Sequence, residues 1–123
     1  MQLHYDDSFN PAAPIVQIGV GATDAPSVVE VRAILDTGSE LTFVPESVVQ
    51  RLGLQRIGMT GIQALGEPVR LVPYYPARIW LGGRFAWFDE VVATSEPYAI
   101  LGRGVLNRSR LTLDGPGGIV TIE

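Results

Sequence analysis

The segment AILDTGS at residues 33–39 is the most informative part of the sequence, because it is an apolar strand that ends abruptly in an acid, a hydroxyl and a glycine. A lone carboxylate at the end of a buried strand costs free energy unless it is hydrogen-bonded or has a chemical task. Gly38 allows the backbone to fold back tightly around that carboxylate. We therefore take Asp36 as a candidate functional group.

The segment before Asp36 has the period-two pattern of a half-buried strand. The apolar side chains occupy alternate positions, at Val29, Val31, Ala33 and Leu35. The polar side chains of Glu30 and Arg32 fall between them, on the other face. This strand delivers Asp36 to its end.

A second stretch, AILGRGVL at residues 99–106, begins with the same three residues. The chain therefore carries a faint internal repeat, in which each half contributes a strand and a tight turn. Only the first copy has the acid, since Gly102 follows the second Ala-Ile-Leu. The alternative interpretation is coincidence, because these three residues are common in protein cores.

Together the two stretches resemble the retropepsin-like aspartic proteases. The residues DTGS and the following LTFVP (41–45) are similar to the active-site turn of that family, and residues 100–103 are similar to its apolar-apolar-Gly-Arg segment. The resemblance covers about residues 15–113. It implies an all-β, mostly antiparallel fold, namely a closed β-barrel-like acid protease fold with one or two short helices.

The resemblance also implies roles for the residues of the turn. Asp36 would supply the catalytic acid or base, and Thr37 would hydrogen-bond across a dimer axis to the turn of a partner chain. Gly38 would offer backbone groups to the substrate. The hydroxyl of Ser39 is expected to donate to the carboxylate and lower its pKa. Ser39 is also assigned to substrate binding.

Two charged residues match positions of the family pattern. Glu40 stands where the family often has an acid, and Arg103 matches the arginine after the second glycine. We expect an ion pair between Glu40 and Arg103 that braces the two turns.

Residues 56–70 contain three glycines among apolar residues and predict a hairpin with its tip within residues 61–66. In the resemblance this hairpin is the flap that closes over substrate. The substrate-binding residues predicted there are Gly61, Ile62, Leu65 and Gly66. The alternative is an ordinary glycine-bearing turn.

Further elements follow from local signals. Pro73 and Pro76 suit an edge strand or a bend. Residues 77–88 read as a hairpin around the Gly82-Gly83 pair. Its aromatic residues are expected in core and cross-strand packing; they are Trp80, Phe85, Trp87 and Phe88. Residues 105–110 read as a short helix, and the chain is expected to end in two short strands joined by a turn at residues 114–118.

The length of 123 residues suits one domain with a hydrophobic core and is too short for two ordinary domains. We expect a single domain over residues 1–123, with residues 1–14 as an N-terminal arm because that segment is polar and interrupted by prolines. Fourteen glycines and nine prolines in a chain that is 46% hydrophobic indicate a β-rich fold with many turns rather than disorder.

Charge and cysteine usage exclude several function classes. A net charge of −4 with nine scattered basic residues argues against a nucleic-acid partner. The chain has no cysteine, so it has no disulfide framework, thiolate nucleophile or Cys-based zinc site. No apolar run approaches membrane-spanning length, and residues 1–14 lack a secretory signal. We expect a cytoplasmic protein that uses no cofactor, metal or membrane.

Peptide hydrolysis can be run by two carboxylates that share a proton. One Asp-Thr-Gly supplies only half of such a pair, so the partner carboxylate must come from another chain. A two-fold homodimer places two copies of Asp36 on its axis.

The sequence thus predicts a homodimeric aspartic endopeptidase that hydrolyses an extended, mainly apolar peptide or protein segment. The second interpretation is a catalytically silent peptide- or protein-binding module with the same fold and dimer. The third is that Asp36-Thr37-Gly38 is merely a turn in another β-barrel.

Overall fold

A computed structural model describes the backbone of residues 1–123 and every side chain except those of residues 85 and 86. Over this described chain there are ten strands and two short helices. The elements, in chain order, are β1 (Gln2–His4), β2 (Ile15–Gly21), β3 (Val28–Leu35), β4 (Thr42–Pro45), α1 (Glu46–Leu52), β5 (Gly58–Ile62), β6 (Arg70–Leu81), β7 (Arg84–Thr94), β8 (Ala99–Leu101), α2 (Arg103–Leu106), β9 (Leu111–Asp114) and β10 (Ile119–Ile122).

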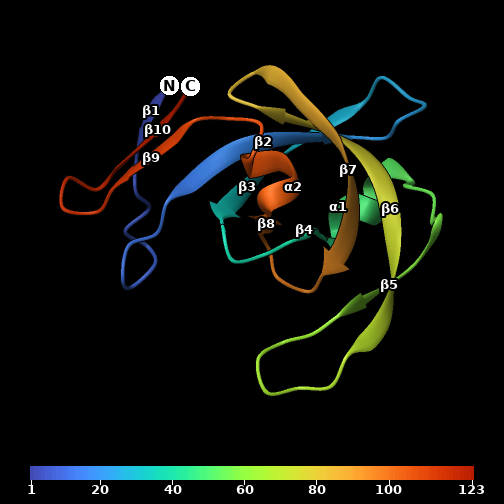
Figure 1. The fold of residues 1–123 in the computed structure, drawn as a ribbon. Coiled ribbons are helices and arrows are strands. Elements are labelled where there is room, and N and C mark those ends of the chain that lie inside the picture. Colours follow the sequence, from blue (N-terminus) through green and yellow to red (C-terminus); the bar gives the residue numbers. More distant parts are fainter.

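Six of the described strands close into a barrel in the order β2-β3-β8-β4-β7-β6, and the pairing of β6 with β2 completes the ring. The β3–β8 and β4–β7 pairs are parallel, and the other pairs are antiparallel. β5 pairs only with the first part of β6, so these two strands project from the barrel as a hairpin (Figure 1). The predicted all-β, mostly antiparallel barrel is confirmed.

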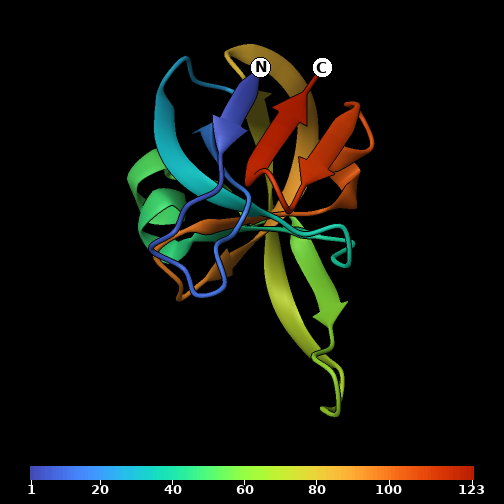
Figure 2. The ribbon, with the colours of Figure 1, turned by 90° about the vertical axis from the view of Figure 1, so that its left-hand side faces the viewer.

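The two ends of the chain meet in a small separate sheet. Its described strands lie in the order β1-β10-β9, and the N- and C-termini are side by side in both ribbon views (Figures 1 and 2). The expected turn between the last two strands is present. Residues 2–4, however, form β1 rather than part of an arm, because they pair with residues 119–121, and Ala13 is also buried.

The core fills the barrel and follows the predicted alternation. Val31, Ala33 and Leu35 of β3 are buried, whereas Glu30 and Arg32 are exposed. Helix α1 packs Val48 and Val49 against the same core and is capped by Gly53, whose left-handed φ of 59° favours glycine. Neither helix of the described residues is long and apolar enough to cross a membrane.

The hairpin of β6 and β7 turns at Gly82 and Gly83, which have φ values of 65° and 76°. This confirms the predicted turn. The prolines of β6 lie where the strand has a neighbour on one side only: Pro73 faces β5, and Pro76 faces β7. The strand is therefore locally an edge at both prolines, although it continues into the closed barrel at residues 78–81.

Two expectations in the second half of the chain were wrong, namely the core position of Trp87 and Phe88 and the bounds of the second helix. Trp87 and Phe88 are 40% and 54% exposed, because residues 87–88 of β7 pair with β6 and lie before the residues that pair with β4. The side chain of Phe85 lies outside the described residues, and Trp80 is partly buried. Helix α2 begins at Arg103 and ends at Leu106, instead of spanning residues 105–110, because the backbone of β8 turns directly into it.

Candidate active site

The two Ala-Ile-Leu repeats lie side by side at the centre of the barrel. β3 and β8 are parallel, and their register pairs Ala33 with Ala99, Ile34 with Ile100 and Leu35 with Leu101. Both strands therefore end at the same edge, one in Asp36 and the other in Gly102. The two Ala-Ile-Leu segments therefore occupy equivalent positions in the sheet, which a chance similarity of sequence does not explain.

Asp36 begins an exposed turn that its own carboxylate organises. The Asp36 N–H donates to the carbonyl of Leu101 at 3.0 Å, which ties the turn to the second repeat. The Gly38 N–H donates to Asp36 Oδ1 at 3.0 Å, and the Ser39 N–H donates to the Asp36 carbonyl at 3.2 Å. A Cβ at Gly38 would lie 3.2 Å from Asp36 Oδ1, so glycine gives the carboxylate room.

At Gly102 the second repeat has no space for any side chain. A Cβ there would lie 2.2 Å from the carbonyl oxygen of Leu41 and 3.0 Å from that of Ser39, both backbone atoms. The Gly102 N–H donates to Thr42 Oγ1 at 3.1 Å, and Thr42 is fully buried. An acid equivalent to Asp36 cannot occupy this position.

Arg103 braces the turn in a way that the sequence indicated only in part. Its Nη1 donates to the carbonyl of Thr37 at 2.9 Å, and its backbone N–H donates to the carbonyl of Ser39 at 2.8 Å. The expected ion pair with Glu40 is present, but its N···O distance is 3.9 Å and the Glu40 side chain is 84% exposed. Exposed pairs of this kind contribute little, so the Thr37 carbonyl is the stronger contact.

The expected hydrogen bond from Ser39 to the Asp36 carboxylate is wrong. Ser39 Oγ donates instead to the carbonyl of Leu41 at 2.6 Å. The hydroxyl thus satisfies a backbone acceptor two residues ahead, where the chain enters β4. Local competition of this kind is typical of serine in turns.

A cleft of about 510 Å³ lies between this turn and the β5–β6 hairpin. The predicted site residues that line it are Asp36, Gly38, Ser39, Gly61 and Ile62. Leu65 and Gly66 lie in the loop between β5 and β6 and line a separate surface hollow, and Leu65 is fully exposed. Thr37 is exposed but does not line the cleft.

Sequence reasoning missed part of the cleft lining, namely Glu40, Leu41, Phe43, Gln63 and Val69. Leu41 and Phe43 are two positions apart, so the alternation of side chains along a strand could have placed both beside the turn. The same alternation could not have predicted Val69, because this residue lies in the loop that precedes β6. A Cβ on Gly61 would lie 3.0 Å from Val69 Cγ1, which shows how closely the two arms of the hairpin approach.

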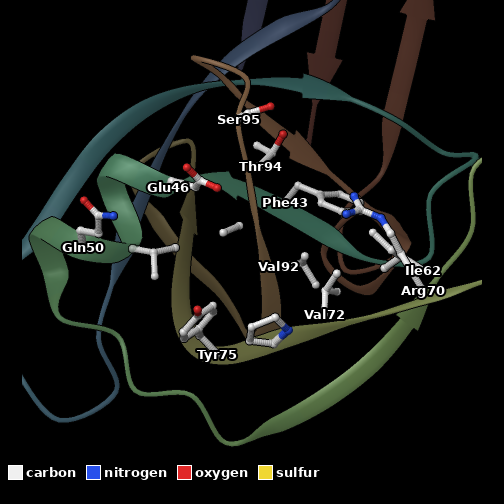
Figure 3. A pocket seen from close by; sticks show the side chains of 13 residues that line it. Phe43, Glu46, Gln50, Ile62, Arg70, Val72, Tyr75, Val92, Thr94 and Ser95 are labelled. Carbon is white, nitrogen blue, oxygen red and sulfur yellow. The ribbon is translucent and has the colours of Figure 1, made fainter.

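A second cavity of about 490 Å³ adjoins the cleft, since Phe43 and Ile62 line both. Figure 3 shows Glu46 and Gln50 reaching it from α1 and Arg70 reaching it from the opposite side. Nothing in the sequence pattern indicated this cavity. Among the described side chains, no group of three or more His, Cys, Asp or Glu residues is placed to hold a metal ion.

Comparison with known proteins agrees with this geometry. The model of an aspartyl protease family matches residues 19–106. A retropepsin-like aspartic protease from Rickettsia conorii superposes with a TM-score of 0.68 at 14% identity, over 99% of this chain and 88% of the other. No curated protein sequence gives a significant match.

Two viral structures have the same fold. The EIAV protease in complex with the inhibitor HBY-793 gives a TM-score of 0.60 at 23% identity, over 82% of this chain and 93% of the other. The simian foamy virus protease gives 0.58 at 18% identity, over 76% and 92%. The family match covers well over half of the sequence and includes the turn at Asp36. The chain therefore belongs to the aspartyl protease family and has the retropepsin-like fold.

Proposed function

We propose that the chain is an aspartic endopeptidase that acts as a homodimer, with one Asp36 from each chain activating the attacking water. The observation that carries this proposal is the contrast between the two repeats. Asp36 is exposed at the end of β3, whereas Gly102 at the end of β8 leaves no space for a second acid. The second carboxylate must then come from another copy of the chain.

The chemistry requires one proton on the acid pair. Two carboxylates about 3 Å apart cannot both ionise, so the pair titrates as a unit. The ionised carboxylate takes a proton from water as the water oxygen attacks the peptide carbonyl, and the protonated carboxyl polarises that carbonyl. This mechanism gives a bell-shaped pH profile on the acidic side of neutrality.

A two-fold axis beside the exposed turn fits the surrounding structure. In an isologous dimer each turn meets its own copy, so Thr37 hydrogen-bonds across the axis and holds the two acids in place. Figure 2 shows β9, the edge strand of the terminal sheet, on the same side of the view as this turn. The open edge of β9 and the exposed Leu113 are therefore available to the partner chain.

The cleft lining indicates the substrate. Leu41, Phe43, Ile62 and Val69 give it an apolar wall, and the hairpin of β5 and β6 forms its cover. An extended peptide segment with mainly apolar side chains fits such a cleft, with Gly38 offering backbone groups to the peptide. Leu65 and Gly66 at the end of the hairpin would contact the peptide when the hairpin closes.

The proposal is tested by incubating a mixed peptide library at several pH values with the wild type and with Asp36→Asn. We expect cleavage between apolar residues, strongest at acidic pH, that disappears in the variant. Peptide binding by both proteins without cleavage by either would instead establish the silent binding module. Cleavage that persists in Asp36→Asn would overturn the assignment of this residue.

A further inference from the structure

Asp89 of β7 is a half-buried acid to which the proposed mechanism gives no task. The Glu90 N–H donates to its Oδ1 at 2.9 Å. Its Oδ2 is shielded from solvent and has no hydrogen-bond partner among the described residues. An unsatisfied buried oxygen of this kind is costly, so its place requires an explanation.

Helix α2 leaves room for this carboxyl because residue 104 is a glycine. A Cβ on Gly104 would lie 3.1 Å from Asp89 Oδ1 and 3.2 Å from Oδ2, which is tighter than ordinary packing allows. The acid therefore fills the space that a side chain at position 104 would occupy. Gly104 belongs to the second repeat, immediately after Gly102 and Arg103.

Thr42 connects Asp89 to the catalytic turn. Its Oγ1 accepts the Gly102 N–H at 3.1 Å, which leaves its own hydroxyl proton free to donate. Thr42 pairs with Val91 of β7, two positions from Asp89 and on the same face of that strand, so the Asp89 carboxyl is the neighbouring acceptor. Burial raises the pKa of the Asp89 carboxyl, and this effect outweighs the lowering by the hydrogen bond from the Glu90 N–H.

We propose that Asp89 is a positioning residue, which orients the Thr42 hydroxyl so that Thr42 holds the backbone of Gly102 beneath the catalytic turn. The chain of contacts continues to Asp36, whose N–H is bound by the carbonyl of Leu101, the residue before Gly102. The role of Asp89 in catalysis rests on the proposed function, but its role in holding Gly102 does not.

Among the described residues, burial and hydrogen bonding, rather than a nearby cation, determine the pKa of Asp89. Glu90 is adjacent and exposed. The guanidinium of Arg103, on α2, is directed to Thr37, and that of Arg78, on β6, binds the carbonyls of Ala22 and Ala25. β4, which carries Thr42, has no charged residue. Among the described side chains, therefore, no cation pairs with Asp89.

The sign of the pH dependence follows from the raised pKa. The folded state favours the protonated carboxyl, so this group stabilises the fold fully below its ordinary pKa of 3.8. The stabilisation is lost as the pH rises through the higher folded-state pKa. We therefore expect the Asp89 carboxyl to favour the folded state most under acidic conditions.

The test compares Asp89→Asn and Asp89→Ala with Glu90→Gln, a matched change of the neighbouring exposed acid. Between pH 4 and pH 7, the Tm of the wild type and of Glu90→Gln should fall by about 3 °C more than that of Asp89→Asn, which cannot ionise. Amide hydrogen exchange at Gly102 should quicken about tenfold in Asp89→Ala and in Thr42→Val, without adding in the double variant. An unchanged exchange rate, or additive effects, would overturn the proposal.

A catalytic readout separates the two proposals. At acidic pH, Asp89→Ala should lose about tenfold in kcat with little change in KM, and Asp89→Asn should restore most of it. If the wild type cleaves no peptide, the proposed function fails, while the stability and exchange results still decide the role of Asp89. A loss of kcat in Asp89→Ala without faster exchange at Gly102 would contradict positioning through Thr42.

Discussion

The end of β3 and the end of β8 begin from the same three residues and finish in opposite ways. After Leu35 the chain opens into an exposed turn with a carboxylate, and after Leu101 it closes against the backbone of Leu41. The first end offers chemistry, and the second supports it through the Leu101 carbonyl and Arg103. A repeat of this kind can share a structural role while only one copy keeps a reactive group.

Removing the acid at the end of β3 should have the largest effect. We expect Asp36→Asn to lower kcat/KM by at least about 10³-fold, because the pair loses its general acid and base. The Tm should stay within a few degrees of the wild type, since the side chain is exposed. Peptide hydrolysis and thermal unfolding measure the two effects. Asp24→Asn, an exposed change elsewhere, is the control and should retain full activity.

Adding a single methyl group at the end of β8 should have the next largest effect. Gly102→Ala should lower the free energy of unfolding by about 3 kcal/mol or more, because the new Cβ meets the Leu41 carbonyl. Gly115→Ala is a matched control, since a Cβ at Gly115 meets nothing within 4 Å. Urea unfolding of the two variants decides the point. Equal stability of both would mean that Gly102 is not required by the fold.

The link between the two ends is tested by Arg103→Ala. The loss of the hydrogen bond to the Thr37 carbonyl should cost about 1 kcal/mol, discounted because the side chain is 42% exposed. Glu40→Gln should cost less than about 0.5 kcal/mol, since it removes only the long, exposed ion pair. If Glu40→Gln proved as damaging as Arg103→Ala in urea unfolding, the ion pair and not the carbonyl contact would brace the turn.

Local patterns predicted much of the barrel. The alternation before Asp36 and the Gly82-Gly83 turn each depend on a few neighbouring residues, so they could be read from the sequence. The register of the two repeats could not, because parallel pairing joins residues far apart in the chain. The same holds for β1, whose polar sequence resembles a loose arm until residues 119–121 pair with it.

The errors at the site and on the hairpin have a common origin. Ser39 has two acceptors within reach, and the sequence does not show that the Leu41 carbonyl is the one it binds. Trp87 and Phe88 have the composition of core residues, but β7 has only one neighbour where they lie. The half-buried acid at Asp89 gave no local signal, since its surroundings are formed by Thr42 and Gly104 from other elements.

In the proposed enzyme two copies of Asp36 act together, and mixing of subunits tests this pairing. Wild-type chains are re-equilibrated with increasing amounts of Asp36→Asn chains, and peptide hydrolysis is measured per wild-type chain. If the two copies act together, this activity falls in proportion to the wild-type fraction, while added Asp24→Asn chains cause no loss. Activity per wild-type chain that stays constant with excess Asp36→Asn would contradict it, because a single chain would then suffice for catalysis.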